Sequence, residues 1–129
     1  MIVVDASALV AIGQREPDRM AIEEALARAN GGLLAPVNYV ETGVILLGRR
    51  FQSSQGQLDA WLSSMRVFVR SDIDLGNSAL RAYLQYGKGF HPARLNLGDC
   101  FAYALAKTLD APLLYKGDDF AKTDIRSAI

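Results

Sequence analysis

The sequence predicts an α/β domain built around a mostly parallel sheet. Four short apolar runs have the composition of buried strands, and segments with helical spacing of apolar residues lie between them. Half of the 129 residues are hydrophobic, enough for a sizeable core and too many for a disordered chain. Because strands that alternate with helices form parallel sheets covered by helices, we expect this class of fold.

The predicted strands are short and apolar. They are Ile2–Val4, Leu33–Ala35, Val67–Val69 and Leu113–Tyr115. The glycine-containing stretches Asn30–Gly32 and Tyr86–Gly89 are typical of loops inside a domain, and no linker or repeat interrupts the chain. Residues 1–129 are therefore expected to form a single domain.

Five segments between these strands have apolar residues at helical spacing. They are Arg19–Ala29, Asn38–Arg50, Leu58–Met65, Ser78–Tyr86 and Asn96–Leu109. The face with Trp61 in the third segment suits core packing, or a surface for a partner.

Bulk composition narrows the classes of partner. The charges of the 14 basic and 14 acidic residues cancel, so a nucleic acid would have to be bound through a local basic patch.

The single cysteine, Cys100, excludes an intramolecular disulfide and fits a reducing compartment. We expect Cys100 to be a small buried hydrophobe. No apolar run approaches a membrane span and no secretory signal is present, which predicts a soluble, cytoplasmic protein without a membrane partner.

Acidic residues follow or flank the predicted strands. Asp5 comes directly after the first strand, and Asp118 and Asp119 follow the last. Glu41 and Asp99 lie in the first turns of predicted helices. Because a helix that follows a parallel strand starts at the strand's carboxyl end, these acids are expected at one edge of the sheet, where such folds bind ligands.

Structural roles also fit several of these acids. The pairs Asn38…Glu41 and Asn96…Asp99 have the spacing of a capping box. An acid in the first turn of a helix interacts favourably with the helix dipole. The pair at 118 and 119 also suits an ordinary turn beside Gly117.

Asp5 points more directly to a metal ion. It ends a strand expected at the centre of the sheet, and the first basic residue in sequence is Arg15. A carboxylate this close to a core needs a partner, and a divalent cation relieves the repulsion among clustered acids. Ser7 stands where a phosphoaspartyl phosphatase carries its second aspartate, which disfavours that mechanism. Ser7 is instead expected to orient Asp5, to bind a phosphate or to cap the next helix.

Four stretches resemble one family over nearly the whole chain: MIVVDASALVAI, NYVETGVIL, YGKGFHPARLNLGDCFAYALAK and APLLYKGDDFAKTDI. In these residues the sequence resembles the PIN-domain ribonucleases and, within them, the VapC toxins of bacterial toxin–antitoxin pairs. The resemblance implies a PIN-like three-layer α/β/α sandwich with a central, mostly parallel sheet of four to five strands. It implies a single PIN domain over residues 1–129.

The resemblance also implies the catalytic residues, Asp5, Glu41, Asp99 and a fourth acid at Asp118 or Asp119, of which Asp118 is favoured. Asp5 and Asp99 would bind Mg²⁺, or Mn²⁺ in its place. Glu41, Asp118 and Asp119 are further candidate ligands, for one cation or two. The implied activity is endoribonucleolytic hydrolysis by water that the cation activates, with tRNA and rRNA as candidate substrates. A homodimer and a VapB-type antitoxin whose tail fills the active site are implied as well.

Cationic residues near this edge are candidates for contact with the RNA backbone. Lys88 and Arg94 lie in a glycine-containing loop before Asp99, with Phe90 available to stack on unpaired bases. Lys116 precedes the last acidic pair, and Ser7 is the remaining candidate for substrate binding. The residues are also compatible with two other functions: a catalytically silent module that binds metal or antitoxin, and a metal phosphohydrolase that acts on small phosphoesters.

Overall fold

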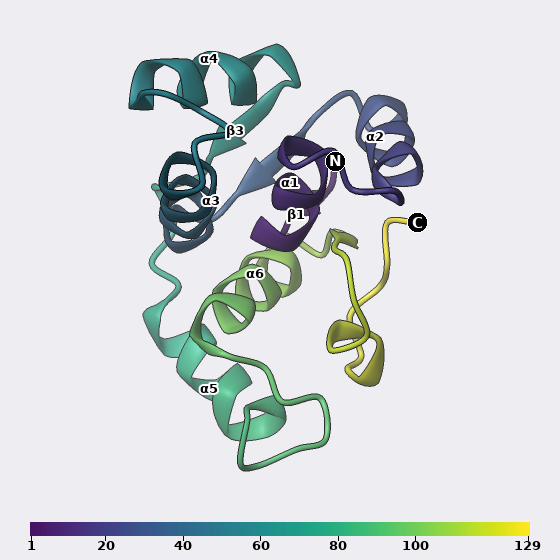
Figure 1. Ribbon diagram of the computed structural model, residues 1–129. Helices are drawn as coiled ribbons and strands as arrows, with labels where there is room; N and C mark the ends of the chain where they lie inside the picture. The colour runs from purple at the N-terminus through teal and green to yellow at the C-terminus, as the bar shows by residue number, and fades with distance from the viewer.

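Four parallel strands form the centre of the structure, in the spatial order β3-β2-β1-β4 (Figure 1). The computed structural model describes residues 1–129. Its strands are β1 (Val3–Val4), β2 (Gly32–Leu34), β3 (Val67–Val69) and β4 (Leu113–Leu114). Every pairing is parallel, and an isolated parallel bridge joins Ser127 to β4. The predicted α/β class and parallel sheet are confirmed, and β1, which carries Asp5 at its end, is an interior strand.

Six α-helices and one short 3₁₀ helix connect and cover these strands. They are α1 (Ala6–Gly13), α2 (Arg19–Arg28), α3 (Pro36–Gly48), α4 (Gln55–Ser64), α5 (Gly76–Tyr86), α6 (Leu97–Thr108) and η1 (Phe120–Lys122). None of them has the length and hydropathy to cross a lipid bilayer. None of the five predicted helical segments covers α1, because its sequence, ASALVAIG, is almost uniformly apolar and so shows no helical period.

Helix α3 begins earlier than its apolar spacing indicated. Pro36 occupies the first turn, a position that suits a residue without a backbone N–H, and so the helix starts two residues before Asn38. Glu41 consequently lies in the second turn. The prediction that Glu41 lies in the first turn was therefore wrong, and the alternative role of the pair Asn38…Glu41 as a capping box is excluded.

The sheet separates two hydrophobic cores, as a three-layer sandwich requires. Val3 and Leu113 face one side of the sheet and pack with residues of α5 and α6. Val4 and Leu114, the next residues along the same strands, face the other side and pack with α1, α2 and α4. This alternation follows from the two-residue period of a β-strand. Figure 1 shows α5 and α6 below the sheet and α4 above it.

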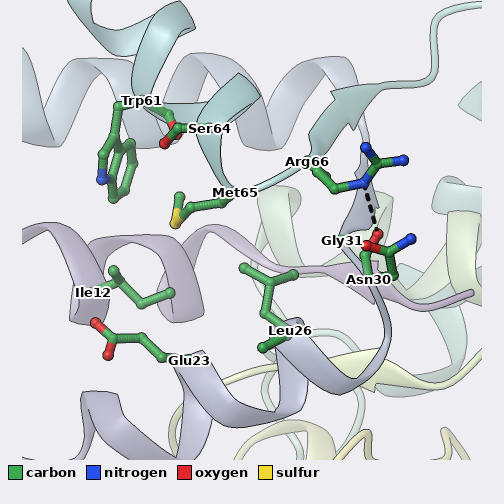
Figure 2. A pocket seen from close by; sticks show the side chains of 10 residues that line it. Ile12, Glu23, Leu26, Asn30, Gly31, Trp61, Ser64, Met65 and Arg66 are labelled. Atoms are coloured by element: carbon green, nitrogen blue, oxygen red, sulfur yellow. Dashed lines mark hydrogen bonds between the residues drawn. The ribbon is translucent and has the colours of Figure 1, made fainter.

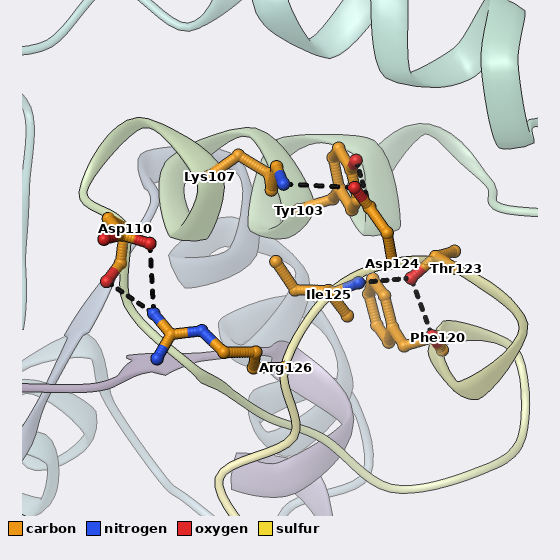
Figure 3. A network of polar contacts seen from close by, with 8 residues as sticks. All are labelled: Tyr103, Lys107, Asp110, Phe120, Thr123, Asp124, Ile125 and Arg126. Atoms are coloured by element: carbon orange, nitrogen blue, oxygen red, sulfur yellow. Dashed lines mark hydrogen bonds and ion pairs between the residues drawn. The ribbon is translucent and has the colours of Figure 1, made fainter.

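The C-terminal segment is attached to α6 by polar contacts (Figure 3). The Asp124 carboxylate accepts hydrogen bonds from the Tyr103 hydroxyl at 2.6 Å and from Lys107 Nζ at 3.1 Å. Arg126 forms an ion pair with Asp110, just beyond the end of α6, at 3.1 Å. We define these five residues as the tail clamp.

Candidate functional site

Asp5 occupies the junction between β1 and α1. Its carboxylate caps α1, and Oδ2 accepts hydrogen bonds from the Ser7 backbone N–H at 3.0 Å and the Ser7 hydroxyl at 2.5 Å. The residue is only 3% exposed, and its Oδ1 is buried without a hydrogen-bond partner. Burial raises the pKa of Asp5 to about 6; the bonds from Ser7 oppose this shift and the charge of Glu41 adds to it.

Glu41 projects from α3 toward the beginning of α6. Its Oε1 accepts a hydrogen bond from Asn38 Nδ2 at 2.8 Å, while its Oε2 receives none. The carboxylate lies so close to Gly98 that a Cβ atom there would stand 2.2 Å from both of its oxygens. Only glycine at position 98 therefore allows Glu41 to occupy this place.

Asp99 is held by the beginning of α6. Asn96 and Asp99 form a reciprocal capping box, in which the Asp99 N–H donates to Asn96 Oδ1 at 2.9 Å and the Asn96 N–H donates to Asp99 Oδ2 at 3.0 Å. The structural role that the sequence suggested is thus present. Even so, burial raises the pKa of Asp99 to about 7 against the effect of this hydrogen bond, with further contributions from Asp5, Asp119 and Glu41. A helix-capping role alone would not require Asp99 to be buried beside other acids.

Asp5, Glu41 and Asp99 line one cavity of about 210 Å³ at the carboxyl edge of the sheet. In each of the three carboxylates, one oxygen is engaged by a hydrogen bond and the other receives none. No ion pair in the molecule involves any of them. As the side chains lie, no three acidic, imidazole or thiol groups are close enough to surround a cation. The structure thus shows three fixed acids with free oxygens, which a cation would have to draw closer together.

Asp119, from the segment after β4, is the fourth acid whose charge acts on this group. Its negative charge contributes to the raised pKa of Asp99. The sequence favoured Asp118, but two adjacent aspartates after a glycine leave the choice to the path of the loop. The charge effect of Asp119 on Asp99 supports Asp119, and the choice of the fourth acid stays a prediction.

The predicted substrate-binding residues fall into two groups. The Ser7 hydroxyl, which donates to Asp5, also accepts a hydrogen bond from the Lys116 backbone N–H at 3.0 Å. The Lys116 ammonium is paired with Glu16 at 3.1 Å and Asp18 at 3.3 Å. Both residues are thus engaged within the protein. Lys88 and Arg94 are exposed and form no ion pair, so their charges are available to a ligand.

Asn38 is a site residue that the sequence did not identify. Its side chain is fully buried, and besides Glu41 it donates to the Gly98 carbonyl at 3.0 Å. The Asn–x–x–Glu spacing suggested a capping box because the earlier start of α3 at Pro36 was not recognised. Cys100, in contrast, is buried as expected, and burial raises the pKa of its thiol to about 11, which makes it a poor nucleophile.

A larger cavity, of about 490 Å³, lies between α1, α2 and α4 (Figure 2). Ile12, Leu26, Trp61 and Met65 supply much of its wall. Glu23 is its only acid, so it has no group of carboxylates comparable to that around Asp5. The predicted apolar face of α4 is divided: Leu58 and Leu62 are in the core, and the half-buried Trp61 lines this cavity.

Comparison with known proteins gives concordant matches over nearly the whole chain. The family model described as PIN domain matches residues 2–126. A protein of Mycolicibacterium smegmatis named Ribonuclease VapC is 44% identical, over 95% of this chain and 96% of that protein. Two proteins of Mycobacterium tuberculosis strain H37Rv, Ribonuclease VapC30 and Ribonuclease VapC42, are 43% and 42% identical. The alignments cover 95% of both chains for VapC30 and 98% of both for VapC42.

Proposed function

The chain belongs to the PIN-domain family, and we propose that it is a metal-dependent endoribonuclease, the toxin of a VapBC-type toxin–antitoxin system. Similar proteins that match nearly end to end are named VapC ribonucleases. One structural observation carries the proposal: Asp5, Glu41 and Asp99 surround one cavity, each with an oxygen free of hydrogen bonds and none with a cationic partner. We propose that residues 1–129 act as a single PIN domain.

The donor set fits Mg²⁺, with Mn²⁺ as an alternative. Both prefer hard oxygen ligands, and the buried Oδ1 of Asp5 has no partner in the protein. We propose Asp5 and Asp99 as the principal ligands, and Glu41 together with Asp118 or Asp119 as the acids that complete the site. When bound, the cation would supply a Lewis acid that stabilises charge on the phosphodiester and makes water a stronger nucleophile near neutral pH.

The protein's own groups hold the acids for this chemistry. Ser7 fixes one oxygen of Asp5, Asn38 fixes one of Glu41, and the capping box fixes one of Asp99. Each contact leaves the second oxygen of the acid unbound. These contacts limit the rearrangement that remains once a cation has drawn the acids together, and such preorganisation is the usual source of catalytic advantage.

We propose that the RNA substrate is recognised in part by the loop before α6. Lys88 and Arg94 are exposed and unpaired there, and they suit contacts with phosphates. Phe90, 60% exposed, offers a face on which an unpaired base can stack. These features favour a single-stranded stretch of a folded RNA in the cytoplasm, such as a loop of tRNA or rRNA.

Two protein partners accompany this function. A cognate antitoxin would inhibit by placing a basic tail in the cavity, since no cation of the chain itself neutralises the acids there. A second copy of the chain would cover exposed apolar side chains. Those of Leu80, Leu84 and Leu97, on α5 and α6, are each more than half exposed.

The test is cleavage of total cellular RNA by purified protein with Mg²⁺, with Mn²⁺ and with excess chelator. The matched variant is Asp99→Asn, which keeps an oxygen to accept from the Asn96 N–H and so preserves the cap. We expect metal-dependent cutting by wild type and none by the variant, with equal circular dichroism spectra.

Other outcomes would support the alternative functions. No cutting of RNA by a folded, antitoxin-free wild type, with cleavage of nucleotides or simple phosphate esters, would show a small-molecule phosphohydrolase. No turnover of either substrate class, with retained binding of metal or antitoxin, would show a silent binding module.

A further inference from the structure

We propose that Asn38 is a positioning residue that fixes Glu41 against the beginning of α6 and so sets the arrangement of acids contributed by two helices. This inference rests on the proposed function and adds a residue to it. Both N–H groups of the Asn38 amide are used, one by Glu41 Oε1 at 2.8 Å and the other by the Gly98 carbonyl at 3.0 Å. One side chain thus connects an acid of α3 to the residue immediately before Asp99.

The orientation of the Asn38 amide follows from its surroundings. A carboxylate and a backbone carbonyl only accept hydrogen bonds, so the Asn38 nitrogen must face both of them. The Asn38 Oδ1 is then left buried with no partner. Burying an unpaired carbonyl opposes folding, and an apolar side chain such as leucine, which has the same branching, would avoid that cost. The two donated bonds are therefore what distinguishes asparagine from an apolar residue at this position.

A neutral donor is also the chemically suitable choice beside Glu41. The charges of Glu41, Asp5 and Asp99 repel one another, and a donor that restrains Glu41 opposes that repulsion. A lysine or arginine would restrain it too, but it would neutralise the carboxylate and compete with a bound cation. The Asn38 amide holds Oε1 and leaves both the charge of Glu41 and its Oε2 available.

The test compares Asn38→Leu with the matched control Thr42→Val. Thr42 is buried in the same helix one turn later, but its hydroxyl donates to the Asn38 backbone carbonyl and not to an acid. Three quantities are measured for each protein: Mn²⁺ affinity by calorimetry, kcat and KM on a short single-stranded RNA, and resistance to urea without metal.

For Asn38→Leu we expect Mn²⁺ affinity and kcat to fall roughly 10- to 100-fold, as for other residues that orient metal ligands. Its urea midpoint should stay at or above that of wild type. Thr42→Val should keep wild-type affinity and kcat. Asn38→Asp, which preserves shape but removes the donors, should lose affinity and kcat as the leucine variant does, and it provides a second test if the leucine variant fails to fold.

A double substitution separates positioning from a general effect on folding. In a Glu41→Gln background, Asn38→Leu should cause no further loss of Mn²⁺ affinity or kcat, because its effect passes through Glu41. Wild-type affinity and kcat in a folded Asn38 variant, or an equal loss in the Glu41→Gln background, would overturn the inference about Asn38 alone. A folded wild type that neither binds Mn²⁺ nor cuts RNA would overturn the proposed function itself.

Discussion

Two aspartates near opposite ends of the chain show how the same type of side chain can serve two different purposes. Asp124, in the tail clamp, is half exposed, accepts hydrogen bonds from Tyr103 and Lys107, and has a pKa below the usual value because of them. Asp5 is buried beside other acids, has one oxygen without a partner, and has a pKa raised to about 6 by that burial.

The difference lies in how each charge affects the fold. The ionised form of Asp124 is stabilised by its partners, so its charge favours the native state. The ionised form of Asp5 is disfavoured by its surroundings, so its charge opposes the native state near neutral pH. A carboxylate that weakens its own fold needs another reason to be present, and a bound cation supplies one.

The largest effect is expected for Asp5→Asn. The variant keeps an oxygen that accepts from Ser7 but loses the charge, so transition-state stabilisation of several kcal/mol, or about 10³-fold in rate, should be lost. RNA cleavage at saturating Mg²⁺ measures this loss. Asp124→Asn is the paired control and should cut at the wild-type rate, since Asp124 belongs to the tail clamp.

Gly98→Ala should have the next largest effect. Its Cβ would meet both oxygens of Glu41, so the acid must move and the rate of RNA cleavage should fall roughly 10- to 100-fold, as when other contacts that orient metal ligands are lost. The control is Gly48→Ala in the same protein, because a Cβ atom at position 48 would meet no atom within 4 Å. Equal rates for the two variants would show that the place of Glu41 does not matter.

The two aspartates should also give opposite pH dependences of stability when a chelator removes metal. Because the folded pKa of Asp5 lies above its unfolded value of 3.8, its contribution to stability is present at low pH and lost as the pH rises to about 6, by roughly 3 kcal/mol in all. Asp99 has the same sign and extends the decline toward pH 7. The lowered pKa of Asp124 has the reverse sign, so its contribution is lost as the pH falls below its unfolded value.

Urea unfolding of wild type and Asp5→Asn between pH 4 and 7 measures the Asp5 contribution. The variant should gain stability relative to wild type as the pH rises. A difference that is constant with pH would mean that the Asp5 charge does not oppose folding. Saturating Mg²⁺ should stabilise wild type at pH 7 and leave the variant nearly unchanged.

The smallest effects belong to the tail clamp. Asp124→Ala removes two charge-assisted hydrogen bonds from a half-exposed site and should lower the free energy of unfolding by about 1 kcal/mol. Asp110→Ala should change it by less than about 0.5 kcal/mol, because the Asp110 side chain is 98% exposed and surface ion pairs contribute little. Thermal unfolding compares the two, and neither should alter RNA cleavage.

The sequence predicted the strands and most helices well because apolar runs and helical periods arise from the residues themselves. The short α1 is almost uniformly apolar, so its sequence shows no helical period. Helix α3 begins at Pro36, earlier than the spacing of its apolar residues indicated. The acids of the site were visible as carboxylates after strands. Their partners were less so, since the bond from Asn38 to Gly98 joins residues 60 positions apart and depends on how two helices pack. The choice between Asp118 and Asp119 likewise depends on the path of a loop.

The most direct measurement of the contrast is the stability and activity of Asp5→Asn beside wild type, at pH 7.5. Urea unfolding is recorded with chelator and with Mg²⁺, and RNA cleavage is recorded in parallel with Mg²⁺. We predict a variant at least as stable as metal-free wild type, not stabilised by Mg²⁺ and unable to cut RNA. A variant that is less stable than metal-free wild type yet still cuts RNA would show that Asp5 serves the fold, and it would contradict a metal site built on Asp5.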